Sequence, residues 1–372
     1  MKKHIKHAQL EKRNFGEHAP NEVAFVGTKC SEIKNLIKKI TPDLDPDTRI
    51  AYMDASHNKD VQATEYDVFT FHHRSGTLDL KRSLKTDRYN DRILFNNYDL
   101  LFINGNHYRG EQQILVLDKD KEDSVQKRID QLNNVQFIIK LTGEVTIFDF
   151  LTEKYPHFRN LPVYHVSEIK KIAQHIEQII LKKVPPVKGL VLAGGKSVRM
   201  GSDKGLLNYH GNSQRDFAIK MLEDMGLNTF LSVRKEQHIE HENVIEDVFL
   251  GLGPFGAICS AFQNDPNSAW LVLATDLPFI DQKTLEFLLK KRNPSKIATA
   301  FKGKNKEFPE PLITIWEPKA YQRMLNFLAQ GFSCPRKTLI NSEVEIVEID
   351  DDLITNVNTP EEYEEVKKRL NA

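Results

Sequence analysis

Residues 188–207 read Lys-Gly-Leu-Val-Leu-Ala-Gly-Gly-Lys-Ser-Val-Arg-Met-Gly-Ser-Asp-Lys-Gly-Leu-Leu, and this stretch decides the fold of the chain. The apolar run 189–193 is bounded by glycines, which predicts a short buried strand. Gly194 and Gly195 end that strand. A glycine pair at this point lets the backbone approach a ligand closely and turns its N–H groups outward. Taken alone, the pair favours a tight turn with solvated basic residues over a ligand-binding loop.

The residues after the glycine pair add positive charge within one loop: Lys196, Arg199 and Lys204. Cations in this arrangement match the charge of a polyphosphate. The whole stretch resembles the signature LAGGxSxRMGxDK of the nucleotidyltransferases that activate sugars, alcohols and cofactors, and it agrees at nearly every fixed position. The resemblance implies a doubly wound α/β nucleotidyltransferase domain, Rossmann-like in its sheet, over residues 187–372.

Composition limits the protein class. The chain has 372 residues, which is long for one domain and predicts two. Hydrophobic residues make up 40% and charged residues 28%, which is typical of a soluble globular protein. Lys+Arg and Asp+Glu both number 52, so no basic excess points to nucleic acid as a partner.

The three cysteines, Cys30, Cys259 and Cys334, are far apart and odd in number. They therefore predict neither a disulfide framework nor a metal cluster, and they favour a reducing compartment. The N-terminus carries lysines and histidines without the apolar segment of a signal peptide, and no apolar run reaches about 18 residues. We expect a cytoplasmic protein with no membrane partner.

The first half of the chain is predicted to be a second α/β domain. Residues 1–20 are polar and basic and suggest a flexible arm, and residues 21–184 alternate strands with helices, which predicts a doubly wound, mostly parallel sheet. Pro185 and Pro186 end the long amphipathic helix 168–183 and mark the domain boundary. Strands are expected at 23–26, 49–53, 66–71, 98–103, 114–117, 135–139 and 161–166.

The turn after the first of these strands reads Gly27-Thr28-Lys29-Cys30-Ser31 and has the outline of a phosphate-binding loop. It lacks the second glycine and the Gly-Lys-Ser/Thr triplet that wrap a phosphate in a P-loop. With this degraded loop, the strand order and the strand at 98–103, residues 21–184 resemble a degenerate MobB-like P-loop domain. We expect an ordinary strand-to-helix turn here and no hydrolysis of ATP or GTP.

Four histidines of this half follow predicted strands: His57, His72, His73 and His107. The carboxyl ends of parallel strands are where α/β sheets bind ligands. Their spacing does not match a metal site, so we expect loop histidines without a ligand.

Three more segments of the second half carry candidate functional residues. Asp247 precedes a glycine-rich turn that begins at Gly253, and Asp276 ends the apolar strand 270–274. A carboxylate at a strand end can hold Mg²⁺ against a triphosphate, although a lone strand-end Asp is commonly a cap. Asn356 and Asn358 are two residues apart and offer donors and acceptors to one polar ligand. Thr284 and Thr359 are expected to cap the helices that follow them.

These segments resemble the molybdenum cofactor guanylyltransferase (MobA) family, in which an acidic residue, a GPLxG turn, a Gly/Cys-Asp-x-Pro strand end and an NxNTP element follow one another. The resemblance implies transfer of GMP from GTP to molybdopterin cofactor, with Mg²⁺ bound and pyrophosphate released. The resemblance implies that Arg199 and Lys204 act as catalytic residues at the phosphates and that Asn356 and Asn358 bind the acceptor. It implies that Asp276 contacts both the nucleotide and Mg²⁺. The other nucleotide-binding residues it implies are Leu192, Ala193, Gly194, Asp247 and Gly253.

The chain departs from the family in two places. Residues 231–234 read Leu-Ser-Val-Arg where many members have asparagines, and residues 307–311 read Glu-Phe-Pro-Glu-Pro where the family has a plainer strand entry. Two alternatives therefore stay open. One is a nucleotidyltransferase that uses CTP or another acceptor such as a sugar phosphate. The other is a non-catalytic protein that delivers cofactor to other biosynthesis proteins or to molybdoenzyme apoproteins.

Overall fold

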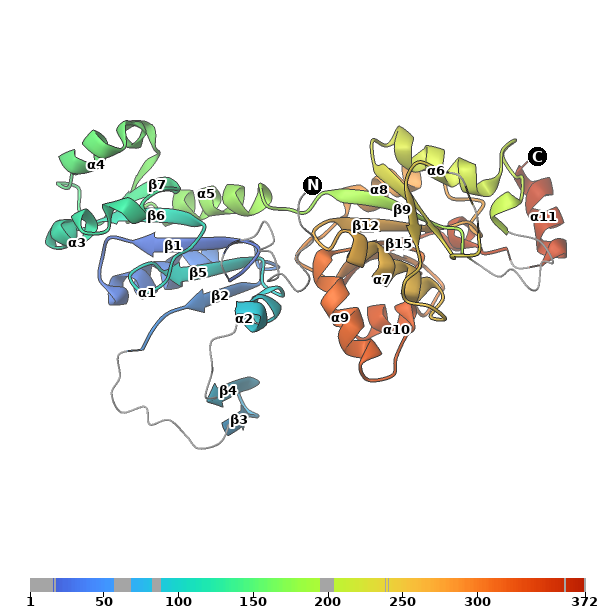
Figure 1. Ribbon diagram of the computed structural model, residues 1–372, viewed down its shortest axis with the longest axis horizontal. Helices are drawn as coiled ribbons and strands as arrows, with labels where there is room; N and C mark the ends of the chain where they lie inside the picture. The colour runs from blue at the N-terminus through green and yellow to red at the C-terminus, as the bar shows by residue number, and fades with distance from the viewer. Residues whose placement is uncertain are drawn as a thin grey trace, which may run out of the picture. The chain divides into compact units, whose positions relative to one another are not determined.

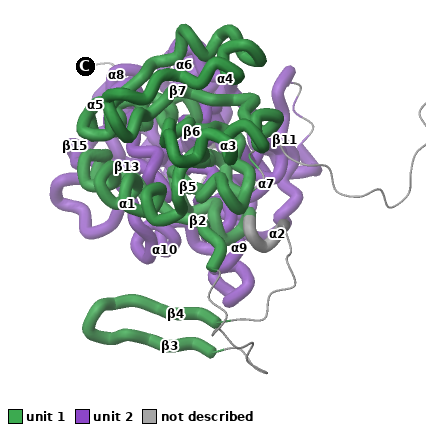
Figure 2. Tube along the Cα trace, turned by 90° about the vertical axis from the view of Figure 1, so that its left-hand side faces the viewer, with its two compact units in different colours: residues 1–183 green, residues 184–372 purple. Residues whose placement is uncertain are grey.

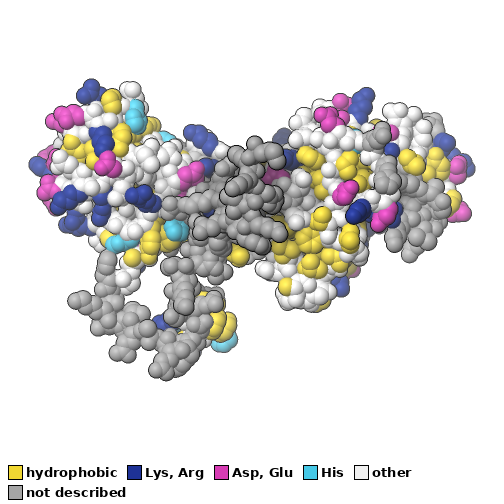
Figure 3. All heavy atoms as spheres, viewed as in Figure 1, with side chains coloured by type: hydrophobic (Ala, Val, Ile, Leu, Met, Phe, Trp, Pro, Cys, Tyr) yellow, Lys and Arg dark blue, Asp and Glu magenta, His cyan; other side chains and the backbone are white. Residues whose placement is uncertain are grey.

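A computed structural model describes residues 16, 18–56, 68–81, 88–194, 204–237, 239, 241–357 and 359–370, of which 88–91 and 204 are described by their backbone alone. The chain divides into two compact units, residues 1–183 and 184–372 (Figure 2). Both kinds of charged side chain occur on each unit (Figure 3). Among the described residues, no helix is both long and apolar enough to cross a membrane.

Unit 1 is built on a six-stranded sheet in the order β2-β5-β1-β6-β7-β8, and every neighbouring pair is parallel (Figure 1). The doubly wound, parallel sheet predicted from the alternating pattern is confirmed. The strands are β1 (Glu22–Val26), β2 (Ile50–Met53), β5 (Leu100–Asn104), β6 (Gln112–Leu117), β7 (Val135–Lys140) and β8 (Val163–His165).

Helices cover both faces of this sheet because successive strand residues point to opposite sides. Val23 and Phe25 pack in one cluster with α1 (Cys30–Ile40) and α5 (Ile169–Leu181). Val26 packs on the other face with α3 (Glu122–Gln126) and α4 (Asp149–Lys154), and Ala24 packs there with the end of α2 (Arg88–Phe95). Of the predicted arm, Ala19 is described and is buried beside Ala24.

One predicted strand of unit 1 does not join the parallel sheet. β3 (Val68–His72) pairs antiparallel with β4 (Thr77–Lys81) in a separate two-stranded sheet. The interpretation of His72 and His73 as residues at the ligand-binding edge of the sheet was therefore wrong, since they lie at the turn of this hairpin. His57 lies outside the described residues.

Unit 2 contains a seven-stranded sheet in the order β11-β10-β9-β12-β14-β13-β15, in which only β14 runs antiparallel to its neighbours. The mostly parallel, Rossmann-like sheet expected for this half is confirmed. The strands are β9 (Val187–Leu192), β10 (Asn228–Val233), β11 (Val244–Glu246), β12 (Ala269–Ala274), β13 (Ala298–Gly303), β14 (Ile313–Trp316) and β15 (Val344–Ile349).

The two faces of this sheet form two separate apolar clusters. Val191 and Leu271 belong to the cluster that includes α6 (Gln214–Asp224) and α8 (Gln282–Lys290). Their strand neighbours Leu190 and Trp270 belong to the opposite cluster. The helices of that second face are α7 (Pro254–Asn264), α9 (Pro318–Leu328) and α10 (Pro335–Ile340).

Of the two predicted helix caps, the one at Thr284 was wrong and the one at Thr359 is confirmed. Asp281, and not Thr284, caps α8: its Oδ1 accepts the backbone N–H of Thr284 at 2.8 Å. The prediction that Thr359 caps the last helix, α11 (Pro360–Leu370), is confirmed. Its Oγ1 accepts the N–H of Glu362 at 3.3 Å, and Glu362 Oε2 accepts the N–H of Thr359 at 3.1 Å, which completes a capping box.

Candidate active site

Four neighbouring parallel strands of unit 2 end at the same edge. Leu192 at the end of β9 lies opposite Ser232 of β10 on one side and Ala274 of β12 on the other, and Val233 lies opposite Glu246 of β11. The residues that follow these strands therefore come together. They include Gly194, Arg234, Asp247 and Asp276. This edge is where open α/β sheets bind their ligands.

Gly194 lies against the side chains that follow β10 and β11. A methyl group in place of its hydrogen would come within 3.4 Å of Arg234 Cγ and 3.5 Å of Asp247 Oδ2. Ala193 before it is buried and donates its N–H to Ser232 O at 3.0 Å. The predicted nucleotide-binding residues Ala193, Gly194 and Asp247 thus form one group.

Gln237 holds the two loops of this group together. Its Nε2 donates to Ala193 O at 2.9 Å, and its Oε1 accepts the N–H of Arg234 at 3.0 Å. The residue was missed at the sequence level because a single glutamine in a polar loop gives no signal. The bridge fixes the start of the glycine loop relative to β10.

Asp247 is in an environment that penalises its charge. Burial raises the pKa of this carboxyl above its ordinary value, and the hydrogen bond from Ser232 and the charge of Arg234 offset this only in part. Ser232 Oγ donates to Asp247 Oδ1 at 2.9 Å. A buried acceptor of this kind is stabilised by further hydrogen-bond donors.

Asp276 is joined to the C-terminal segment that carries the predicted acceptor residues. The backbone N–H of Val357 donates to Asp276 O at 2.9 Å. On the other side, Thr275 Oγ1 donates to Leu192 O at 3.5 Å. The structure therefore brings together the β9 end, the β12 end and the segment at Asn356, which lie up to 165 positions apart in the sequence (357 − 192).

Glu310 reaches the same region because β14 runs antiparallel to β12. The amino end of β14 consequently lies beside the carboxyl end of β12, and Ala274 N donates to Leu312 O at 3.0 Å. Glu310 is buried and accepts a hydrogen bond from Arg336 Nη2 at 2.9 Å. Burial raises the pKa of Glu310, and the negative charge of Asp276 raises it further. The sequence signalled this residue only as a departure from the family pattern.

Tyr209 is a second residue that the sequence did not indicate. Its ring is 4.9 Å from the ring of Tyr363 and belongs to an apolar cluster with Val357. Its hydroxyl oxygen is buried and has no hydrogen-bond partner among the described residues. Burial raises its pKa, and the charges of Tyr363 and Asp276 act in the same direction.

The structure describes only some of the remaining predicted site residues. Arg199 and Asn358 lie outside the described residues, and Lys204 opens a short 3-10 helix (Lys204–Leu206) with its side chain outside the description. Gly253 has φ +57° and lies directly before the proline that begins α7, a conformation that favours glycine.

Asp276 could contribute one carboxylate to a divalent cation. The buried carboxyl of Glu310 is close enough to Asp276 for the two to interact electrostatically, but the ion pair with Arg336 at 2.9 Å offsets the charge of Glu310. Among the described residues, no group of three or more His, Cys, Asp or Glu side chains could hold a metal ion. A cation at Asp276 would therefore need water and ligand oxygens to complete its shell, as Mg²⁺ commonly does.

Residues 189–343 match the family model described as a MobA-like NTP transferase domain. A molybdenum cofactor guanylyltransferase from Xanthomonas euvesicatoria is 30% identical over 190 residues, which cover 48% of this chain and 93% of that protein. A molybdenum cofactor biosynthesis bifunctional protein from Synechocystis is 33% identical over 186 residues, or 49% of this chain, and the chain spans only 54% of its length.

Among solved structures, the chain is similar to molybdopterin-guanine dinucleotide biosynthesis protein A from Archaeoglobus fulgidus, with 24% identity and a TM-score of 0.42 over 50% of this chain and 98% of that one. The Xanthomonas relative is matched over 93% of its length, and Gly194, Asp247 and Asp276 follow strands that end at one sheet edge. The chain therefore belongs to the MobA-like nucleotidyltransferase family.

Proposed function

We propose that unit 2 transfers GMP from GTP to molybdopterin cofactor and releases pyrophosphate. The observation that carries the proposal is the hydrogen bond from Val357 N to Asp276 O, because it joins the segment expected at the acceptor to the carboxylate expected at the triphosphate. Family membership supports the nucleotidyl transfer, and the Xanthomonas relative's name supports the guanylyl group and the cofactor acceptor.

The nucleoside end of GTP would lie against the group at β9, β10 and β11. The backbone of residues 192–194 borders this site, and Gly194 leaves room beside Asp247 that a side chain would fill. Asp247 would accept hydrogen bonds from the guanine base. Those bonds would compensate the burial of its carboxyl, which the single bond from Ser232 does only in part.

The triphosphate would extend toward Asp276. Arg199 and Lys204 would neutralise charge on the α-phosphate and on the leaving pyrophosphate, as the sequence signature implies. Asp276 would hold Mg²⁺, which when bound supplies further positive charge at the same oxygens. Arg336 and Glu310 would fix the neighbouring strand entry through their ion pair.

The acceptor end would be held by Asn356 and Asn358, which offer amide donors and acceptors to the pterin. The attacking group is a phosphate monoester that is already ionised, so the reaction needs no strong general base. The chain contributes by orienting the two phosphates and by stabilising the charge that develops between them.

The test is a panel of nucleotides and acceptors with the full chain. Pyrophosphate release is followed by a coupled phosphatase with GTP, CTP, ATP and UTP, each with molybdopterin or with a sugar phosphate. The proposal predicts release only with GTP and molybdopterin together. Release with CTP and molybdopterin, or with a sugar phosphate, would establish the corresponding alternative transferase instead. Absence of release in every combination would favour a carrier protein.

A further inference from the structure

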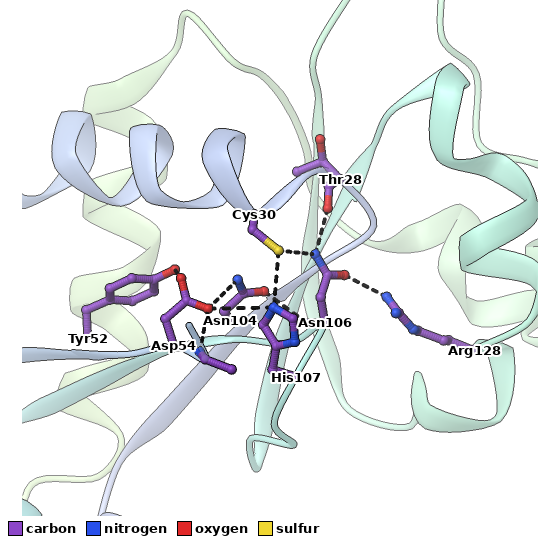
Figure 4. A network of polar contacts seen from close by, with 9 residues as sticks. Thr28, Cys30, Tyr52, Asp54, Asn104, Asn106, His107 and Arg128 are labelled. Atoms are coloured by element: carbon purple, nitrogen blue, oxygen red, sulfur yellow. Dashed lines mark hydrogen bonds and ion pairs between the residues drawn. The ribbon is translucent and has the colours of Figure 1, made fainter. Parts of the chain in front are cut away.

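The sheet edge of unit 1 holds a cluster of polar side chains around a cysteine (Figure 4). Phe25 near the end of β1 lies opposite Asn104 at the end of β5, and Met53 at the end of β2 lies opposite Ile103. The residues after these three strands therefore meet at one place. They are Cys30 at the start of α1, Asp54 after β2, and Asn106 and His107 after β5.

The sulfur of Cys30 faces two nitrogen atoms. His107 Nε2 is 3.3 Å from Cys30 Sγ, and Asn106 Nδ2 donates to the same sulfur at 3.6 Å. The amide of Asn106 is fixed from both sides, since Nδ2 also donates to Thr28 O at 2.8 Å and Oδ1 accepts from Arg128 Nη1 at 2.7 Å. The donor that faces the sulfur therefore cannot turn away without losing two good hydrogen bonds.

The same nitrogen of His107 also faces a carboxylate. Asp54 Oδ1 lies 3.8 Å from His107 Nε2. Burial would raise the pKa of Asp54, but hydrogen bonds from Tyr52, from the N–H of Ala55 and from Asn104 outweigh it, so the pKa lies below its ordinary value. The three bonds are each 2.8 Å long. Asp54 is thus a fixed negative charge beside the atom that would accept a proton from Cys30.

We propose that Cys30 is a nucleophilic thiol that exchanges with disulfides, and that His107 accepts its proton. In this step the Cys30 S–H proton moves to His107 Nε2, and the sulfur attacks one sulfur of a disulfide R–S–S–R. A new S–S bond forms to Cys30, the R–S⁻ group leaves, and it takes the proton from the imidazolium. One disulfide is consumed and one mixed disulfide is formed, so no further oxidant or reductant is required.

The cluster favours sulfur chemistry over phosphate binding. The turn that resembles a degenerate phosphate loop has Thr28 Oγ1 donating to Asp118 Oδ2 at 2.7 Å, which places a carboxylate beside the loop. The turn also lacks the second glycine and the Gly-Lys-Ser/Thr triplet that would wrap a phosphate. In contrast, a cysteine next to a histidine and at the beginning of a helix is a microenvironment typical of reactive thiols.

The other two cysteines are internal controls. Cys334 is half-buried like Cys30. Cys259 is buried, and burial raises its pKa to about 12. A difference in rate between Cys30 and Cys334 therefore reports on the neighbours of the sulfur and not on exposure alone.

The experiment treats the native full chain at pH 7 with an excess of the disulfide 5,5′-dithiobis(2-nitrobenzoate) and follows the released thiolate. Peptide mass analysis at early times assigns each phase to a cysteine. Cys30 should react at least about tenfold faster than Cys334, as expected for an activated thiol. Cys30→Ser should remove the fast phase and keep the phase of Cys334.

His107→Gln should slow the Cys30 phase by about tenfold, because it removes the proton acceptor, while the rate of Cys334 stays the same. An unchanged Cys334 rate shows that unit 2 is still folded, and an unchanged thermal unfolding transition shows the same for unit 1. Asp54→Asn keeps the shape of its side chain and should slow Cys30 by a smaller factor. Equal rates for Cys30 and Cys334, or a Cys30 rate that His107→Gln leaves unchanged, would overturn the proposal. The inference is independent of guanylyl transfer, which Cys30→Ser should leave unchanged.

Discussion

Tyr209→Phe tests whether the described site leaves a buried hydroxyl unsatisfied in the absence of ligand. Tyr209 is 6% exposed, and its hydroxyl has no hydrogen-bond partner among the described residues. Burial of a polar group without a partner costs about 1–3 kcal/mol. Phe keeps the ring contact with Tyr363 and removes only the oxygen. The substitution should therefore raise the free energy of unfolding of the ligand-free protein by about 1 kcal/mol.

The expected change is measurable by thermal unfolding. A gain of about 1 kcal/mol corresponds to a rise in Tm of about 2–4 °C for a unit of 150–250 residues. If the hydroxyl also donates a hydrogen bond to a substrate bound next to Asp276, the same variant should lose transfer activity by about tenfold, which corresponds to one hydrogen bond. The two measurements should move in opposite directions, which a general packing defect would not produce.

Tyr363→Phe is the matched control. Tyr363 donates its hydroxyl to Asn208 O at 3.1 Å, so its removal should lower the Tm slightly while Tyr209→Phe raises it. A Tm of Tyr209→Phe below that of the wild type would refute the reasoning, since it would mean that the hydroxyl contributes a stabilising contact.

Three further predictions concern the site itself. Asp276→Asn should reduce turnover on the order of a hundredfold and should raise the Mg²⁺ concentration that the reaction needs. Lys204→Ala should reduce turnover but leave the Mg²⁺ requirement unchanged. Both results come from measuring the transfer rate as a function of Mg²⁺ concentration. Replacement of Asn356 and Asn358 by Ala should weaken cofactor binding while the Kd for GTP changes by less than about threefold, or roughly 0.7 kcal/mol, in calorimetry. The pKa of Glu310 is raised above 4.5 mainly by burial. The folded state therefore binds the proton of the Glu310 carboxyl more tightly than the unfolded state does. The free energy of unfolding should consequently fall as the pH rises from 4.5 through the folded-state pKa. Glu310→Gln should remove this fall in urea unfolding measured above pH 4.5.

The sheet architecture was predictable because strands and helices alternate along both halves, and because the glycine turns mark the strand ends. The alternating pattern does not give strand direction or sheet membership. Residues 66–71 therefore predicted a strand of the parallel sheet, whereas β3 pairs in a separate hairpin with β4, where Phe69 and Phe71 are exposed. The antiparallel direction of β14 also left no mark in the sequence.

Site residues could be predicted from the sequence only where they belong to a recognisable motif. Asp247 and Asp276 follow strands and belong to recognisable strings, but Gln237 and Tyr209 depend on contacts between loops far apart in the sequence. Glu310 comes to the site because β14 reverses direction, which periodicity cannot show. In unit 1, Cys30 and His107 are 77 positions apart, and only the parallel register of β1 and β5 brings them together.

The central claim is tested most directly by the mass of the cofactor product. The full chain is incubated with molybdopterin, GTP and Mg²⁺, the cofactor is extracted, and its mass and the released pyrophosphate are quantified. We expect a product heavier by one GMP unit, in equal amount to the pyrophosphate, and on the order of a hundredfold less of both with Asp276→Asn. An unchanged cofactor mass in the presence of folded wild-type protein, or equal product from Asp276→Asn, would contradict the account.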